Sequence, residues 1–178
     1  EVTSAFLVRR ARVYLTSRIS PNVTGRVQVN ALPDKVVLLE GYFHWQPFPA
    51  APAFAFRGGM IKKPFGYQEY ELSSGGLNLI DRTFTNEFLE KTLHATAEDL
   101  GAAAYADLRE YDIPLTVHAG VFNGDAKGNK TDPNSGKEFV ARAEGVPVTG
   151  LTLGANGAVN RVGPQDLSET YVIWGGDC

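Results

Sequence analysis

The chain has 178 residues, of which 43% are hydrophobic and 21% are charged, and its formal net charge is −3. The length fits one ordinary domain, and the mixed composition excludes a disordered chain. The acidic balance argues against a nucleic-acid-binding protein, for which a basic surface is expected. No stretch approaches the ~20 apolar residues of a membrane-spanning helix, but the alternating strands of a membrane β-barrel are compatible with this composition.

The first predicted element is a strand over residues 6–19. Reading every second residue separates it into a mostly apolar face, which includes Leu7, and a face that carries Arg10, Arg12 and Arg18. A soluble β-sandwich would bury the apolar face in its core and leave the arginines in water. A transmembrane barrel would turn the apolar face to lipid and the arginines to a lumen.

Eight further segments repeat this alternation, and turn residues separate them. They cover residues 25–32, 37–46, 53–61, 100–108, 115–121, 139–144, 151–160 and 170–174. The connection at 147–150 is short, whereas the polar connection at 123–136 is long, an asymmetry typical of outer-membrane barrels. We therefore expect an all-β, antiparallel sheet of about nine strands.

Residues 64–100 interrupt the β pattern. Phe84, Phe88 and Leu89 fall at helical spacing, and Thr85 together with Glu87 suits the start of a helix. A connection of this length inside a compact β protein is usually either functional or disordered. We expect a folded-in segment with a short helix, which in a barrel is a candidate constriction.

The polar faces of the predicted strands carry more basic than acidic side chains. A guanidinium group stays charged and its fork matches phosphate or carboxylate oxygens, so these arginines are candidates for an electropositive path. The solvated face of a soluble sheet is the alternative interpretation. The arginines are Arg10, Arg12, Arg18, Arg26, Arg57, Arg109 and Arg142, and the acids are Glu40, Asp107 and Glu144.

The sequence contains no constellation of residues that an enzyme would need. His44, His94 and His118 lack a second histidine at metal-ligand spacing, and the single cysteine, Cys178, excludes an internal disulfide or a multi-cysteine zinc site. No nucleophile elbow, phosphate-binding loop or dinucleotide fingerprint occurs. We therefore expect no catalysis, no cofactor and no metal.

Four motifs in order resemble the phosphate-selective porin O and P family. The first is RRARVYLTSRISPNVTGRVQVN at 9–30, which is similar to an arginine-rich strand–turn–strand of that family. The second is FRGGMIKKPFGYQEYELSSGGLNLIDRTF at 56–84, with a glycine-containing strand, a Pro-Phe-Gly step and a hydrophobic-acid-Arg cluster. The series continues with AGVFNGDAKGNKTD at 119–132 and VARAEGVP at 140–147. The resemblance covers nearly the whole chain.

The resemblance implies a barrel of about 16 strands in the bacterial outer membrane, commonly trimeric, which passes small anions such as phosphate. It implies that the lumen is lined by Arg10, Arg12, Arg18 and Arg26. It also implies that residues 64–82 border the pore, with Arg82 in the place of the family's acid–arginine pair. The chain departs from the family in showing no lysine-rich inward strands. Nine strands cannot close such a barrel, because unpaired edges in lipid leave backbone groups unsatisfied, so we expect one barrel region that is part of a larger protein.

Three functional hypotheses follow. The first is a porin that passes small anions by passive diffusion through an arginine-lined lumen. The second is an outer-membrane barrel that serves as a structural or docking component, with its lumen filled by residues 67–99. The third is a soluble β-sandwich that acts as a binding module.

Overall fold

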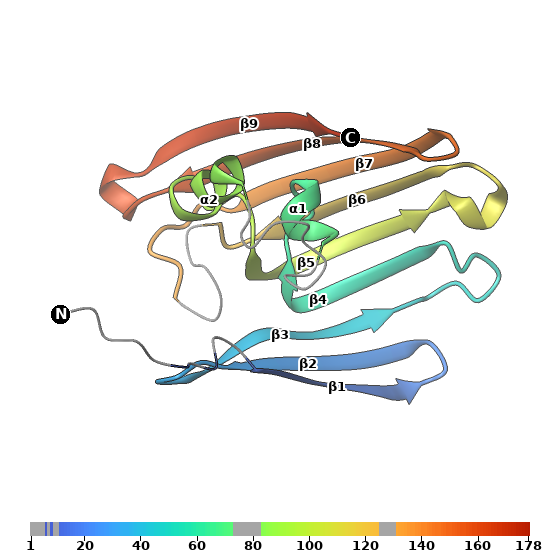
Figure 1. Ribbon diagram of the computed structural model, residues 1–178, viewed down its shortest axis with the longest axis horizontal. Coiled ribbons are helices and arrows are strands. Elements are labelled where there is room, and N and C mark those ends of the chain that lie inside the picture. Colours follow the sequence, from blue (N-terminus) through green and yellow to red (C-terminus); the bar gives the residue numbers. More distant parts are fainter. Residues whose placement is uncertain (1–5, 7, 9–10, 73–82, 125–130) are drawn as a thin grey trace.

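The structure, a computed structural model, describes residues 6, 8, 11–72, 83–124 and 131–178. Nine β-strands in these residues form one antiparallel sheet, and each strand pairs with its neighbours in chain order (Figure 1). The strands are β1 (Ala11–Ser20), β2 (Val23–Ala31), β3 (Val36–Trp45), β4 (Phe54–Lys62), β5 (Glu98–Asp107), β6 (Leu115–Phe122), β7 (Glu138–Val148), β8 (Leu151–Val162) and β9 (Glu169–Asp177). The all-β antiparallel architecture predicted from the alternation is confirmed.

The sheet is not closed. Within the described residues, β1 and β9 each pair with a single neighbour, so they form its two edges. Because every pairing is antiparallel, the odd-numbered strands all run in the same direction, and β1 and β9 therefore point the same way. Among the described residues the first strand begins at Ala11, and Phe6 and Val8, which belong to the predicted strand, lie outside it.

A glycine in β4 is required by the backbone. Gly59 has a φ of +127°, and a Cβ there would lie 2.9 Å from the Cα of Tyr42 and would meet the carbonyl oxygen of Gly41. Only glycine accepts this combination of a positive φ and a close neighbouring strand. No side chain therefore projects at position 59, two residues after Arg57 on the same face of β4.

The helical elements are short. They are the α-helices α1 (Tyr67–Tyr70) and α2 (Phe84–Lys91) and the 3₁₀ turns η1 (Leu108–Tyr111) and η2 (Gln165–Leu167). The helix α2 matches the predicted helical spacing, but its N-cap is Thr83 rather than Thr85, because the Thr83 hydroxyl accepts a hydrogen bond from the backbone N–H of Asn86 at 3.4 Å. Figure 1 shows α1 and α2 on the same face of the sheet.

An apolar cluster on that face joins the segment between β4 and β5 to the sheet. Its buried members are Ile61, Phe65, Ala103, Phe122, Val140 and Ala158, and Leu89 of α2 packs against them. Two glycines make room for the ring of Phe122: a Cβ on Gly101 would lie 2.5 Å from its Cδ1, and a Cβ on Gly120 would lie 2.6 Å from its Cε2. The small residues thus let an aromatic ring lie flat on the strands beneath the segment.

A buried ion cluster, formed by Lys63, Asp99 and Glu138, fixes both ends of the same segment. The Nζ atom of Lys63 lies 2.7 Å from Oε2 of Glu138 and 3.9 Å from Oδ2 of Asp99, and it also donates to the carbonyl oxygen of His94. Asp99 accepts hydrogen bonds from the backbone N–H groups of Gly124 and Leu100, each at 2.7 Å. None of the three charged side chains is more than 3% exposed, so the chain leaves β4 and returns to β5 through one buried anchor.

Candidate anion site

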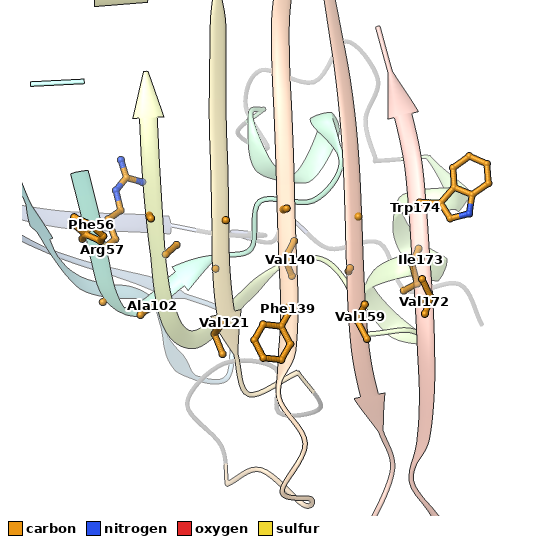
Figure 2. A pocket seen from close by; sticks show the side chains of 18 of the residues that line it. Phe56, Arg57, Ala102, Val121, Phe139, Val140, Val159, Val172, Ile173 and Trp174 are labelled. Atoms are coloured by element: carbon orange, nitrogen blue, oxygen red, sulfur yellow. The ribbon is translucent and has the colours of Figure 1, made fainter. Parts of the chain in front are cut away.

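The sheet has two chemically different faces. One of them, the apolar face, exposes large hydrophobic side chains from β1 to β9; Leu15 is 71% exposed and Trp174 is 85% exposed. Val121, Phe139 and Val159 are direct cross-strand neighbours on this face and lie side by side in Figure 2. Soluble monomers rarely leave so extended an apolar surface in water. Exposing the apolar face to water therefore costs free energy.

Small residues hollow the centre of the apolar face. The row that crosses β4 to β9 begins with Phe56, ends with Trp174, and has only alanine or glycine between them: Ala104, Ala119, Ala141 and Gly157. The result is a groove of about 860 Å³, lined mainly by apolar side chains.

The opposite face, the polar face, contains a second hollow of about 580 Å³. Its walls come from β2 to β6 and from α1, which lies over it. The volume falls in the range of small-molecule sites. Arg57 of β4 lines this hollow, and we call the hollow the Arg57 pocket.

Arg57 sits among aromatic rings rather than acids. Its Nε–H donates to Nδ1 of His44 at 3.2 Å. Its Cζ atom lies 4.5 Å from the ring centre of Tyr105 and 5.3 Å from that of Tyr42. No carboxylate of the described residues pairs with it. Since ring faces attract a cation without carrying a formal negative charge, Arg57 keeps its charge for a ligand.

The rings continue from Arg57 toward α1. The ring of Tyr105 lies 5.0 Å from that of His118, and the ring of His118 lies 5.2 Å from that of Tyr70. Within the part of the chain that the structure describes, the buried Nδ1 atom of His118 has no hydrogen-bond partner. We call Tyr42, Arg57, Tyr105, His118 and Tyr70 the aromatic row.

Acidic side chains surround the aromatic row. The acids that line the Arg57 pocket are Glu40, Glu71, Asp107 and Glu110, and the basic residues that line it are Arg26, Arg57 and Lys62. Burial raises the pKa of Glu71, and the nearby Glu144 carboxylate raises it further. Burial likewise raises the pKa of Tyr70, so its hydroxyl stays protonated. Of these four acids, Glu40 pairs with Arg26 and Asp107 pairs with Arg109, so Glu71 and Glu110 are the other lining acids, and neither pairs with Arg57 in the described chain.

Arg142 lies on the polar face but is buried, at 2% exposure. Its Nη2 donates to Glu144 at 2.8 Å, and its two terminal nitrogens donate to the two carboxylate oxygens of Asp177 at 2.7 and 2.8 Å. A fourth bond goes to Oδ1 of Asn156. The protein's own carboxylates therefore neutralise Arg142, and it is out of reach of a solute.

The other predicted arginines differ in their partners. Arg26 pairs with Glu40 at 3.0 Å. Arg109 lies in η1 rather than in a strand, and the hydrogen bond from its side chain to Asp107 at 2.6 Å raises its pKa. Arg18 donates to the carbonyl oxygen of the turn residue Pro21, and Arg12 lies on the polar face of β1. Arg10 and Arg82 lie outside the described residues.

No protein-family model matches the chain, and no curated protein matches it. Within the described residues, no helix is long and apolar enough to span a membrane. The same residues contain no group of three or more His, Cys, Asp or Glu side chains that could hold a metal ion.

The sequence interpretation singled out Arg57 but missed its surroundings. His44 and His118 read as isolated histidines in the sequence, and no local pattern connects Tyr42 or Tyr105 with Arg57. The available signal was position: each falls on the polar face of its strand. The register then places His44 opposite Arg57 and Tyr105 opposite His118.

Proposed function

We propose that the chain forms the wall of a porin-like β-barrel in a bacterial outer membrane, related to the phosphate-selective porin O and P family, which passes small anions by passive diffusion. The observation that carries the proposal is the two-faced sheet. Exposed aliphatic and aromatic side chains cover one face, and arginines, amides and carboxylates cover the other. Lipid is the environment in which the first face is favourable, and a water-filled lumen suits the second.

The strand lengths support the same proposal. The nine described strands have 8 to 12 residues each, close to the ~9–11 residues of a tilted strand that crosses a bilayer. We propose outer-membrane lipid as the partner of the apolar face and a homotrimer as the assembly.

The proposal requires that the edges β1 and β9 be paired. An unpaired edge in hydrocarbon leaves several kcal/mol per backbone group unsatisfied. Because β1 and β9 run in the same direction, purely antiparallel closure takes an odd number of additional strands between them. Seven such strands give the 16 that the family resemblance implies.

The path for anions passes the Arg57 pocket. Arg57 is the one polar-face arginine that projects into a hollow without a carboxylate partner among the described residues. A fixed positive charge in a narrow, partly desolvated passage lowers the free energy of an anion there and raises that of a cation. The segment anchored by Lys63 carries α1 over this pocket and narrows it.

Two measurements test the proposal. In planar bilayers with a salt gradient, the full-length protein should conduct, with a reversal potential of the sign that anion preference gives. In vesicle insertion, Ala141→Arg should weaken membrane integration by about 2–4 kcal/mol, whereas Ala141→Val should not. On a soluble surface the arginine would change stability by only about 0.5 kcal/mol or less. A cation-preferring current, or tolerance of Ala141→Arg, contradicts the proposal.

A second candidate function has one specific observation in its favour. The segment between β4 and β5 fills part of the polar face through Phe65 and Leu89, as a lumen plug would. A barrel that serves as a structural or docking component predicts stable membrane insertion with no solute flux. The bilayer measurement separates the two candidates directly.

A further inference from the structure

We propose that the Arg57 pocket selects monovalent aromatic carboxylates, such as benzoate, over phosphate. The proposal rests on the proposed function in that it assigns a solute class to the same lumen. It stands on three features of the pocket: the guanidinium of Arg57, which has no carboxylate partner among the described residues, the rings that flank it, and the acids in the lining.

The first feature is the guanidinium itself. His44 takes the Nε–H of Arg57, and no carboxylate of the described chain pairs with the terminal nitrogens. Two parallel N–H groups match the two oxygens of a carboxylate in a bidentate pair. The guanidinium plane is held by the rings of Tyr42 and Tyr105, so little rotational freedom is lost when an anion binds.

The second feature is the set of rings. From Arg57 the aromatic row runs through Tyr105 and His118 to Tyr70, with successive ring centres about 5 Å apart. Rings at such distances favour offset or edge-on contact with another aromatic ring. A planar ligand whose carboxylate pairs with Arg57 extends its ring along this row. A small hydrated anion such as phosphate gains nothing from these contacts.

The third feature is the charge around the pocket. Four acids and three basic residues line it; Glu40 pairs with Arg26 and Asp107 pairs with Arg109, which leaves Glu71 and Glu110 as the other lining acids. A phosphate dianion would place two negative charges beside one guanidinium, in a pocket that Glu71 also lines. Two like unit charges about 4 Å apart repel by ~1 kcal/mol even in water. A monovalent anion satisfies Arg57 without this excess charge.

The unpartnered Nδ1 of His118 adds a polar atom to the row. Neutral imidazole donates or accepts one hydrogen bond at this nitrogen, and leaving it unmade when buried costs free energy. A ring substituent such as a hydroxyl group could satisfy it. Hydroxybenzoates should therefore bind at least as tightly as benzoate.

The test uses calorimetry on the full-length protein folded in detergent micelles, with sodium benzoate, sodium acetate and inorganic phosphate as probes at pH 7. We expect benzoate to bind about tenfold more tightly than acetate, since the two differ by the ring, and more tightly than phosphate. Arg57→Lys keeps the charge but loses the fork and should abolish measurable benzoate binding. Tyr105→Leu should bring benzoate close to the level of acetate; because the Tyr105 ring also holds the guanidinium, acetate binding should weaken too, but by a smaller factor than benzoate binding.

The outcomes separate this proposal from the proposed function. The proposal is overturned if phosphate binds as tightly as benzoate, or if Tyr105→Leu binds benzoate as tightly as the unsubstituted protein does, even when the bilayer current prefers anions. An absent or cation-preferring current overturns the proposed function even when benzoate binds at Arg57. With an anion current present, benzoate should also reduce it at concentrations about tenfold lower than acetate does, and an equal effect of both anions counts against selection by the rings.

Discussion

Replacing Lys63 with methionine should lower the free energy of unfolding by about 3–5 kcal/mol. Methionine fills the same space, but it leaves the carboxylates of Glu138 and Asp99 without their buried cation. One carboxyl group can then take up a proton, which limits the cost: neutralising a glutamate of ordinary pKa, about 4.3, at pH 7 requires about 3.7 kcal/mol. The lost bond from Lys63 to the carbonyl oxygen of His94 contributes about 1 kcal/mol more.

A second substitution makes the reasoning refutable. In the Lys63→Met background, Glu138→Gln removes the carboxylate that would need a proton, so the double variant should recover at least about 2 kcal/mol. Both free-energy changes are to be measured by urea unfolding of the protein in detergent or lipid vesicles, with tryptophan fluorescence as the signal. A loss below about 1 kcal/mol for Lys63→Met, or no recovery in the double variant, would show that the cluster does not anchor the segment electrostatically.

Three further predictions concern the polar face. The pKa of Glu71 is raised in the folded protein, so this carboxyl group takes up a proton at a higher pH than in the unfolded chain. Protonation of Glu71 therefore stabilises the folded state as the pH falls, and this stabilisation is lost as the pH rises. Lowering the pH from 7 to 5 should therefore increase anion preference in reversal-potential measurements, and Glu71→Gln should show that preference already at pH 7 with little further response; an unchanged response in this variant contradicts the assignment. Gly154→Ala should destabilise the protein by about 1–3 kcal/mol in urea unfolding, because the new Cβ would lie 2.6 Å from Nη2 of Arg142. Gly157→Ala is the control: no atom lies nearer than 3.9 Å to its new Cβ, so it should be nearly neutral. Equal destabilisation by the two substitutions would rule out this packing argument. Thr83→Ala should cost about 1 kcal/mol by removing the N-cap of α2, and Thr83→Ser should cost less; proteolysis rates of α2 that are the same in both variants would argue against a capping role.

The alternation of side chains made the strands predictable because it is a local property. All nine strands fall where two-residue periodicity placed them, and the bounds differ by a few residues at the ends. Barrel closure could not be predicted in the same way, because alternation gives the direction of each side chain but does not say which strands pair at the edges of the sheet. The closed 16-stranded barrel therefore stays a proposal.

The partners of each arginine could not be predicted from local pattern. Arg142 reads as a pore residue in its own strand, yet Asp177, 35 residues later, forms a bidentate pair with it. Arg57 reads the same way, yet it faces rings instead of acids. The difference depends on cross-strand register and on where α1 crosses the sheet, and a single sequence does not reveal either.

The connectivity of the sheet also has a consequence for the order of folding. Each strand pairs with the strands next to it in the chain, so the hairpins close shorter loops and can form early, except for β4 and β5, which residues 63–97 separate. The bond between Lys63 and Glu138 joins residues 75 positions apart and needs β4, β5 and β7 in place first. Docking of the segment between β4 and β5 should therefore be a late step, so that the polar face stays uncovered while the strands pair.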